Sequence, residues 1–265
     1  MTDDPAAVRA LEALYHAAPP SREPPTHRYG LLGGTDGYVA RVPVRPPFGP
    51  APLEDAWSFI EWRATEDVLA AERRLVCLHA GGVRVNRRNA LIIGESGAGK
   101  STLVAHLLKA GHPVWGDDLV CFAAETAEFS AFPRSLKLDD NSLSGLALAE
   151  DITSGARQGT LLAPPVAYIS PAAFRADWQA PPGRIDAVVL LSADRHRGEA
   201  AVEAASEGAA AITAAQSIIA GGATLERDTI MVRILEAMRG ASAWRVSGAH
   251  PAAGARALEE VLANA

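Results

Sequence analysis

The chain has 265 residues, a length that suits one large domain or one domain with a small appendage. Because 48% of the residues are hydrophobic and only 21% are charged, the chain can form a substantial core. The formal net charge is −6 and no basic block is present, so neither nucleic acid nor an anionic membrane is expected as the main partner.

The ends of the chain and its cysteines bear on the compartment. The amino terminus, Met1–Asp4, is acidic and leads into no apolar stretch of secretory length, and no apolar run is long enough to span a membrane. Cys77 and Cys121 lie in apolar, strand-like runs without metal-ligand spacing, so we expect buried, reduced thiols. These features predict a cytoplasmic protein.

Residues 1–53 are predicted to form a small N-terminal extension or lobe, separate from a domain over residues 54–265. Within this segment the pattern predicts a helix over residues 5–16 and a strand over residues 38–44. Five prolines between residues 43 and 52 should then break regular structure. We expect the segment to pack at an edge of the domain or on its substrate side, and a free linker is the alternative.

The main domain begins with a predicted helix over residues 54–73, whose Trp57 and Trp62 are expected in the core. A strand is predicted over residues 75–78, followed by a hairpin over residues 83–88 that leads into a buried strand over residues 90–93. We therefore expect a mixed sheet with antiparallel members ahead of the glycine-rich segment.

A glycine-rich segment, Gly94–Ser101, fits the pattern G-x-x-x-x-G-K-[ST]. A buried strand precedes it, and apolar residues at helical spacing follow it until Gly111. The glycines let successive backbone N–H groups point inward as a nest for anionic oxygens, and the helix that follows adds its positive dipole end. The pattern predicts a phosphate-binding loop; a structural glycine turn is the alternative.

Two side chains in this loop have specific predicted roles. Lys100 can reach the β- and γ-phosphates of a bound nucleotide, and the Ser101 hydroxyl can bind Mg²⁺. The motif recognises phosphates, so it leaves the preference for a nucleotide base open. The residues predicted to bind the nucleotide are Gly94, Glu95, Ser96, Gly97, Ala98, Gly99, Lys100, Ser101 and Thr102.

Two adjacent carboxylates, Asp117 and Asp118, interrupt an apolar strand-like run over residues 113–122. A right-handed βαβ unit would place this strand beside the one before the loop and so bring both carboxylates near the phosphates. Because adjacent strand residues point to opposite faces, we expect the two to have different roles, with one toward Mg²⁺ or the phosphates. A turn with two solvated acids is the alternative.

Arg134 and Lys137 follow at short spacing and are predicted to clamp phosphates or an acidic substrate, with solvated surface charge as the alternative. Residues 139–142 are typical of a loop and helix cap. Residues 150–183 are rich in glycine and proline, which favours loops and a flap over the substrate.

The remaining elements are read from periodicity. A buried strand is predicted over residues 185–191, and a polar turn over residues 194–198. The alanine-rich residues 199–221 favour a weak helix, and residues 225–239 a stronger one. A last strand over residues 243–246 and a closing helix over residues 251–263 complete the chain.

The stretch from His79 to Phe122 resembles the C-terminal kinase domain of the bacterial HPr kinase/phosphorylase family. Three segments match in order: His79–Val83, Gly94–Ser101 and Ala110–Val120. With Phe132–Lys137 added, the pattern is most similar to HPr-kinase-related proteins, some of which are encoded beside genes for ribosomally made peptides, including lasso peptides. The resemblance implies an α/β fold with a P-loop kinase core of the HPr kinase/PEP carboxykinase type, a mixed central sheet and flanking helices.

The resemblance also implies a reaction, in which ATP phosphorylates a serine hydroxyl with the help of Mg²⁺. Asp118 is the expected base toward that hydroxyl, and Asp117 and Ser101 the expected ligands of Mg²⁺. His79 would lie close to the phosphates and orient an aspartate; a buried histidine bonded to backbone is the alternative. The related family forms hexamers, so a homo-oligomer of open stoichiometry is expected.

The chain departs from the family in two places. The family signature with a glutamate and Arg-Gly-x-Gly is not visible between residues 123 and 184, and the segment before residue 54 is too short for the family's separate amino-terminal domain. Both departures argue against HPr as the substrate and against phosphorylase activity. We expect a peptide acceptor, most specifically a serine near the end of a lasso-type precursor peptide. A small-molecule kinase and a nucleotide-regulated binding protein are the alternatives.

Overall fold

The structure is a computed structural model. It describes residues 26–72, 75–148, 160–163, 165–192, 200–219, 226–247 and 251–264, together with Pro5, Val8 and Glu150. The predicted helix over residues 5–16 and the predicted turn over residues 194–198 therefore lie largely or wholly outside the described residues. Among the described residues, no helix is both long and apolar enough to cross a membrane.

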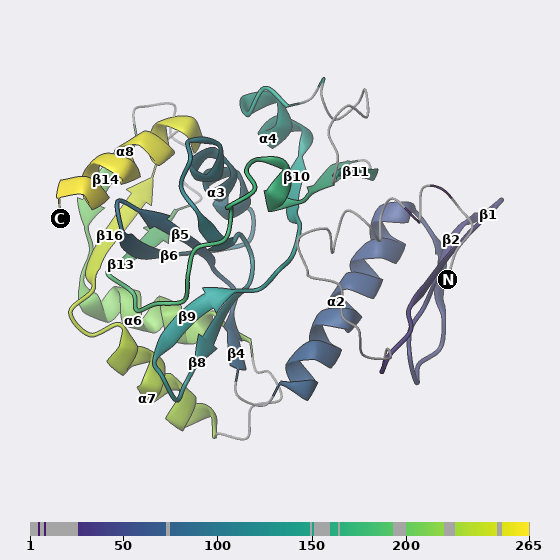
Figure 1. The fold of residues 1–265 in the computed structure, drawn as a ribbon, viewed down its shortest axis with the longest axis horizontal. Coiled ribbons are helices and arrows are strands. Elements are labelled where there is room, and N and C mark those ends of the chain that lie inside the picture. Colours follow the sequence, from purple (N-terminus) through teal and green to yellow (C-terminus); the bar gives the residue numbers. More distant parts are fainter. Residues whose placement is uncertain are drawn as a thin grey trace.

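A six-stranded sheet forms the centre of the molecule (Figure 1). Its strands, in spatial order, are β14 (Ala201–Ala204), β16 (Ser242–Ser247), β13 (Ala187–Leu191), β6 (Arg88–Gly94), β5 (Gly81–Val85) and β7 (Val114–Gly116). β13 runs parallel to both β6 and β16, whereas β5, β7 and β14 pair antiparallel with their neighbours. The fold is thus α/β with a mixed central sheet, and the expected antiparallel member ahead of the loop is confirmed.

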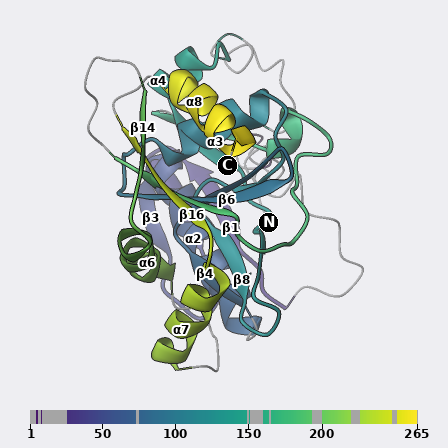
Figure 2. The ribbon, with the colours of Figure 1, turned by 90° about the vertical axis from the view of Figure 1, so that its left-hand side faces the viewer.

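Helices cover both faces of this sheet. α3 (Lys100–Lys109) and α8 (Pro251–Asn264) lie on one face, and α6 (Glu207–Gln216) and α7 (Arg227–Ala237) on the other (Figures 1 and 2). α3 buries Leu103, Val104, Leu107 and Leu108 against the sheet, as their spacing predicts. Gly111, with φ +103°, follows the last turn of α3 in the left-handed conformation that favours glycine.

A second sheet is antiparallel throughout and consists of β15 (Ile218–Ile219), β4 (Leu75–Leu78), β8 (Val120–Ala123) and β9 (Glu128–Ala131), in that order. β7 and β8 follow each other in the chain but belong to different sheets. The chain therefore changes sheets within three residues, and Asp117 and Asp118 lie at this change. Cys77 and Cys121 face each other across β4 and β8 as buried free thiols, as predicted.

One topological expectation is wrong. The strand after α3 was expected beside β6, but β5 lies between β6 and β7. The reason is the β5–β6 hairpin, whose two-residue turn at Asn86 and Arg87 has positive φ at both positions and folds β5 directly onto β6. Because β13 occupies the other edge of β6, the strand after α3 can only join the sheet outside β5.

The N-terminal residues form a lobe of their own. β1 (Gly30–Gly34), β2 (Gly37–Arg41) and β3 (Phe48–Ala51) make a three-stranded antiparallel sheet that packs on α2 (Leu53–Ala71). Pro50 lies within β3, an edge strand that tolerates proline, so the proline-rich stretch is not wholly irregular as expected. The domain boundary at residue 53 stays a prediction. Apolar residues of α2, among them Trp57 and Ile60, pack against apolar residues of the lobe.

Two further expectations about side chains and segments need correction. Trp57 is buried at the centre of the α2 contacts, but Trp62 is 43% exposed. The alanine-rich residues after 199 are not one helix: β14 pairs with β16 first, and Ser206 caps α6 by accepting a hydrogen bond from the N–H of Ala209.

The region expected to be loop-rich contains short strands. β10 (Leu136–Asp139), β12 (Val166–Ile169) and β11 (Thr160–Ala163) form a small antiparallel sheet, followed along the chain by a 3₁₀ turn at Pro171–Ala173. α4 (Asp140–Gly145) begins where predicted, because the Asp139 carboxylate accepts a hydrogen bond from the N–H of Ser142 at 2.8 Å. Residues 151–159 of the expected flap lie outside the described residues. The one strand expected over residues 113–122 is wrong, because β7 and β8 are separate strands and the two aspartates lie between them. The other predicted strands and helices of the main domain are confirmed to within about two residues.

Packing at β5 supplies a stability prediction. A Cβ at Gly82 would lie 2.8 Å from Cε3 of Trp115, a fully buried indole. Gly82→Ala should therefore destabilise the protein by about 1–3 kcal/mol, as overpacked core sites do, and lower the midpoint of thermal unfolding. Gly208→Ala on α6 is the control, because a Cβ there meets nothing within 4 Å. Equal midpoints for wild type and Gly82→Ala would contradict this packing.

Candidate active site

The glycine loop connects β6 to α3 and lines a cavity of about 620 Å³. Gly97 and Gly99 have φ of +78° and +97°, so the loop conformation itself favours glycine at both positions. At Gly94 the constraint is space, since a Cβ would lie 2.5 Å from the carbonyl oxygen of Leu191 on β13. Residues Ser96 to Thr102 all line the cavity. The loop leads directly into the N-terminus of α3, which begins at Lys100.

Lys100 lies beneath this loop and is almost entirely buried. Its Nζ donates hydrogen bonds to the carbonyl oxygens of Gly94, at 2.8 Å, and Glu95, at 3.2 Å. Burial lowers the pKa of Lys100, while the neighbouring charges of Asp118 and Asp117 oppose that shift. Gly94 and Glu95 thus contribute carbonyl groups that hold the lysine, and they are not among the described residues that line the cavity.

Asp117 is a buried carboxylate next to the loop. It forms a hydrogen bond with the side chain of Ser101, the second residue of α3. Burial raises the pKa of Asp117 to about 6, with the charge of Asp118 adding to the shift and the Ser101 bond and Arg134 opposing it. Asp117 therefore contacts the loop through Ser101 and is not among the described residues that line the cavity.

Asp118 has different surroundings, because its side chain is 37% exposed and lines the cavity. Its Oδ1 lies 3.1 Å from Nδ1 of His79, and its Oδ2 accepts a hydrogen bond from Nη1 of Arg134 at 3.2 Å. Burial lowers the pKa of His79; the charge of Asp118 opposes this shift, and those of Lys100 and Arg134 add to it. Both oxygens of Asp118 are thus held from opposite sides.

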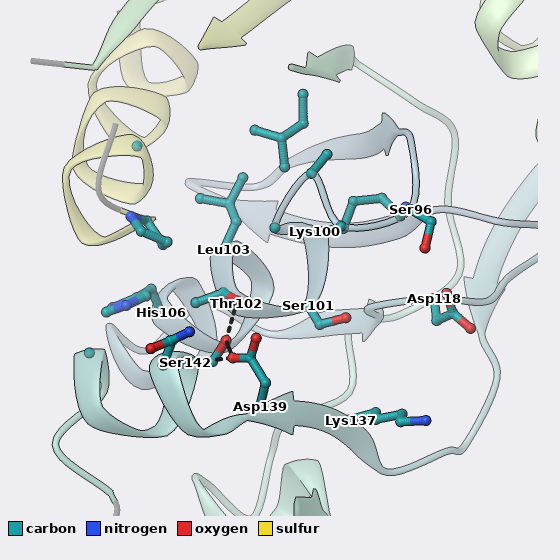
Figure 3. Close-up of a pocket in the computed structure, with 18 of the residues that line it drawn as sticks. Ser96, Lys100, Ser101, Thr102, Leu103, His106, Asp118, Lys137, Asp139 and Ser142 are labelled. Carbon is teal, nitrogen blue, oxygen red and sulfur yellow. Dashed lines mark hydrogen bonds between the residues drawn. The ribbon is translucent and has the colours of Figure 1, made fainter. Parts of the chain in front are cut away.

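The far wall of the cavity is built by other elements. Figure 3 shows Ser96, Lys100 and Asp118 toward one end of the cavity and Thr102, His106 and Ser142 toward the other. There the hydroxyl groups of Thr102 and Ser142 lie 2.6 Å apart, and Ser142 donates to Asp139 at 2.6 Å. These bonds join α3 to α4 beside the loop.

The two cations predicted to clamp phosphates are both paired with carboxylates of α2. Arg134 Nε donates to Glu61 at 2.6 Å, and its guanidinium is not among the described groups that line the cavity. Lys137 does line the cavity, but its Nζ donates to Glu54 at 2.8 Å and lies over the ring of Tyr168. Arg134 is therefore placed to hold Asp118 rather than to meet a ligand directly.

Sequence reasoning missed Glu61 as a residue of the site. Glu61 is only 3% exposed, on the same side of α2 as the buried Trp57 and Ala64. A glutamate at helical spacing from buried apolar residues is a signal of a paired charge, because an unpaired buried carboxylate is costly. Its partner, Arg134, lies 73 residues away in the chain, so the pairing itself has no local signature.

The donor set near the loop fits Mg²⁺ held mainly by a nucleotide. Among the described residues, no group of three or more His, Cys, Asp or Glu is placed to hold a metal. Ser101 and Asp117 nevertheless bring a hydroxyl and a carboxylate together. Mg²⁺ is commonly bound through one or two such oxygen ligands, with phosphate oxygens and water completing its shell.

Comparison with known proteins gives little. No family model matches the sequence, and no curated protein matches it. Among solved structures, the Hpr(Ser) kinase/phosphatase from Coxiella burnetii matches over 71% of this chain and 94% of that chain, with 15% identity and a TM-score of 0.37. A TM-score this low supports no conclusion about the function of this chain.

The raised pKa of Asp117 predicts how replacement of this residue changes stability at different pH values. The pKa of Asp117 rises from 3.8 to about 6 on folding, so the ionised form is disfavoured in the folded protein. Since one pKa unit corresponds to about 1.4 kcal/mol, ionisation costs roughly 3 kcal/mol of stability above pH 6, and the cost fades as the pH falls toward 4. Asp117→Asn should therefore raise the unfolding midpoint of the nucleotide-free protein at pH 8 and change it little at pH 4.

Thermal unfolding at both pH values, without nucleotide or Mg²⁺, checks this expectation. Asp36→Asn, in the exposed turn between β1 and β2, is the control for the loss of an exposed carboxylate. A less stable Asp117→Asn variant at pH 8 would contradict the account of this carboxylate.

Proposed function

We propose that this protein is a Mg²⁺–ATP-dependent kinase that phosphorylates a serine hydroxyl of a peptide. The observation that carries the proposal is the shared cavity of the glycine loop and Asp118, with Lys100 beneath the loop. A phosphate cradle and a carboxylate that lines the same cavity are what phosphoryl transfer to an alcohol needs. The resemblance of the segments around His79, Gly94 and Asp118 supports a serine acceptor.

The loop would bind the phosphates of ATP. Its residues Ser96 to Thr102 line the cavity at the positive end of α3, where a nest of backbone N–H groups would bind phosphate oxygens. Lys100 now donates to two backbone carbonyl groups, and a phosphate oxygen is a stronger acceptor for the same ammonium group. Ser101 and Asp117 would hold Mg²⁺, which when bound neutralises charge that develops on the phosphate oxygens.

Asp118 would act on the acceptor. Its carboxylate accepts the proton of the serine hydroxyl as the serine oxygen bonds to the γ-phosphorus, and the bond from that phosphorus to the β–γ bridging oxygen breaks to release ADP. His79 and Arg134 hold the two oxygens of this carboxylate in place, which keeps its orientation before the acceptor arrives.

The acceptor class follows from the lining of the cavity and from the resemblance. Lys137 and Val166, from the small sheet of β10 and β12 next to the N-terminal lobe, line the cavity, and Lys137 lies toward its Asp118 side (Figure 3). A side chain on a peptide can reach Asp118 there. The resemblance to HPr-kinase-related proteins favours a lasso-type precursor peptide as the acceptor, and a cytoplasmic homo-oligomer as the working form.

A kinase assay tests the proposal. We expect wild-type protein with Mg²⁺ and ATP to add one phosphate to a serine peptide, with peptides encoded by neighbouring genes as the first candidates, detected by mass spectrometry. Asp118→Asn should lower the rate by roughly 100-fold or more, the usual contribution of a general base, and leave ATP affinity almost unchanged. Asp36→Asn is the control with normal activity.

The phosphate should be transferred to the serine hydroxyl of the peptide. Replacing the acceptor serine of an active peptide with alanine should abolish the mass increase. The proposal would be contradicted if the wild-type protein bound ATP but phosphorylated no serine peptide. Full activity of the Asp118→Asn variant would also contradict it.

A further inference from the structure

A chain of paired polar side chains connects the N-terminal lobe to the cavity. It runs from Glu61 on α2 to Arg134, then to Asp118, and ends at His79. Glu61 is almost completely buried and Arg134 nearly so, with side-chain exposures of 4% and 16%. Asp118 and His79, by contrast, both line the cavity.

The two contacts of Arg134 use different edges of its guanidinium group. Nε donates to Glu61 at 2.6 Å, and Nη1 donates to Asp118 at 3.2 Å. Because the group is planar and rigid, a short bond at Nε fixes the plane in which Nη1 points. Glu61 does not touch Asp118, but it sets the orientation of the group that does.

Asp118 needs such support because it lies in the bend between two sheets and not within a strand. Its backbone is held, since its carbonyl oxygen accepts a hydrogen bond from the N–H of Ala80 at 3.2 Å. In the part of the chain that the structure describes, the partly exposed carboxylate is held by His79 at one oxygen and by Arg134 at the other. Without the bond to Glu61, the long Arg134 side chain would have one fewer restraint.

Attachment of the N-terminal lobe to the rest of the protein does not by itself explain why the Glu61 carboxylate is buried. A second ion pair, from Glu54 to Lys137, already joins α2 to the same segment at 2.8 Å. A buried ion pair contributes little net stability compared with apolar packing, whereas breaking one is costly. Apolar residues in place of both Glu61 and Arg134 would be expected to stabilise this contact about as well, so stability alone does not account for the buried pair.

We infer that Glu61 is a positioning residue for the phosphoryl transfer: through Arg134 it holds the carboxylate of Asp118 toward the acceptor. The inference rests on the proposed function and adds to it that the N-terminal lobe supplies part of the catalytic geometry. Truncation or displacement of α2 would then impair transfer even with the nucleotide bound.

The test compares four full-length variants, one of which is Arg134→Gln alone. Glu61→Gln keeps the size of the side chain and removes its charge; Glu66→Gln, on the same helix, breaks only a partly exposed ion pair with Arg63. The fourth, Glu61→Gln with Arg134→Gln, asks whether the two residues act together. The first readout is kinetic, with kcat and the KM for ATP measured separately.

We expect Glu61→Gln to lower kcat by at least about 10-fold, since a small misplacement of a catalytic group can cost about 100-fold, with the KM for ATP within about twofold. Glu66→Gln should match wild type. The double variant should be no slower than Arg134→Gln alone, because Glu61 acts only through Arg134. Unchanged kcat in Glu61→Gln, or fully additive losses in the double variant, would overturn the inference.

The second readout needs no kinase activity. In ¹⁵N-labelled, nucleotide-free protein at fixed pH, the Nδ1 resonance of His79 reports its bond to Asp118. Glu61→Gln should move this resonance in the direction of the Asp118→Asn variant, and Glu66→Gln should leave it in place. A His79 resonance identical to wild type in a folded Glu61→Gln variant would also overturn the inference.

These readouts separate the inference from the proposed function. If wild type transfers no phosphate but His79 responds as expected, the kinase proposal fails while the coupling of Glu61 to Asp118 stands. If Glu61→Gln does not fold, Arg134→Lys replaces it, since lysine keeps the charge but lacks the rigid fork that reaches Glu61 and Asp118 together. The same loss of kcat and shift of His79 are then expected.

Discussion

The site depends on one change of direction in the chain. Between β7 and β8 the backbone leaves the six-stranded sheet and enters the four-stranded one within residues 117–119. Gly116 makes this possible: its φ is +148°, and a Cβ would lie 2.8 Å from the carbonyl oxygen of Leu119. A side chain there would force the bend open and move both aspartates away from the loop. Asp117 and Asp118 therefore owe their places to the sheet change.

Charge balance explains the order of groups around the loop. Lys100 lies between two carboxylates, and Arg134 lies between Asp118 and Glu61, so each buried charge has an opposite neighbour. Asp117 is the group with the poorest compensation, which is why burial raises its pKa. Such a carboxylate gains most from a divalent cation, whereas Asp118 has partners already and remains open to the cavity. The different surroundings support different roles for two adjacent residues.

Much of this arrangement could be predicted from local sequence. The glycine loop, its flanking strand and helix, and the Asp139 cap are short-range patterns in which each residue type has a direct backbone reason. The place of β7 was not predictable in the same way, because hairpin formation by β5 and pairing with β13 decide which edge of β6 remains free. Glu61 was missed for a related reason, since its partner is distant in sequence and its neighbours on α2 suggest only core packing. Trp62 was expected in the core because it is aromatic and close in sequence to Trp57, but its side chain lies on the exposed side of α2.

The central claim is that the glycine loop holds a triphosphate whose terminal phosphate faces Asp118. The most direct measurement is a crystal structure of the protein with Mg²⁺ and a non-hydrolysable ATP analogue. The account predicts phosphate oxygens on the N–H groups of residues 97 to 101, Lys100 turned from the carbonyl of Gly94 to a phosphate, and the γ-phosphate on the Asp118 side of the cavity. An analogue bound away from the loop, or a γ-phosphate directed toward Ser142 and away from Asp118, would contradict it.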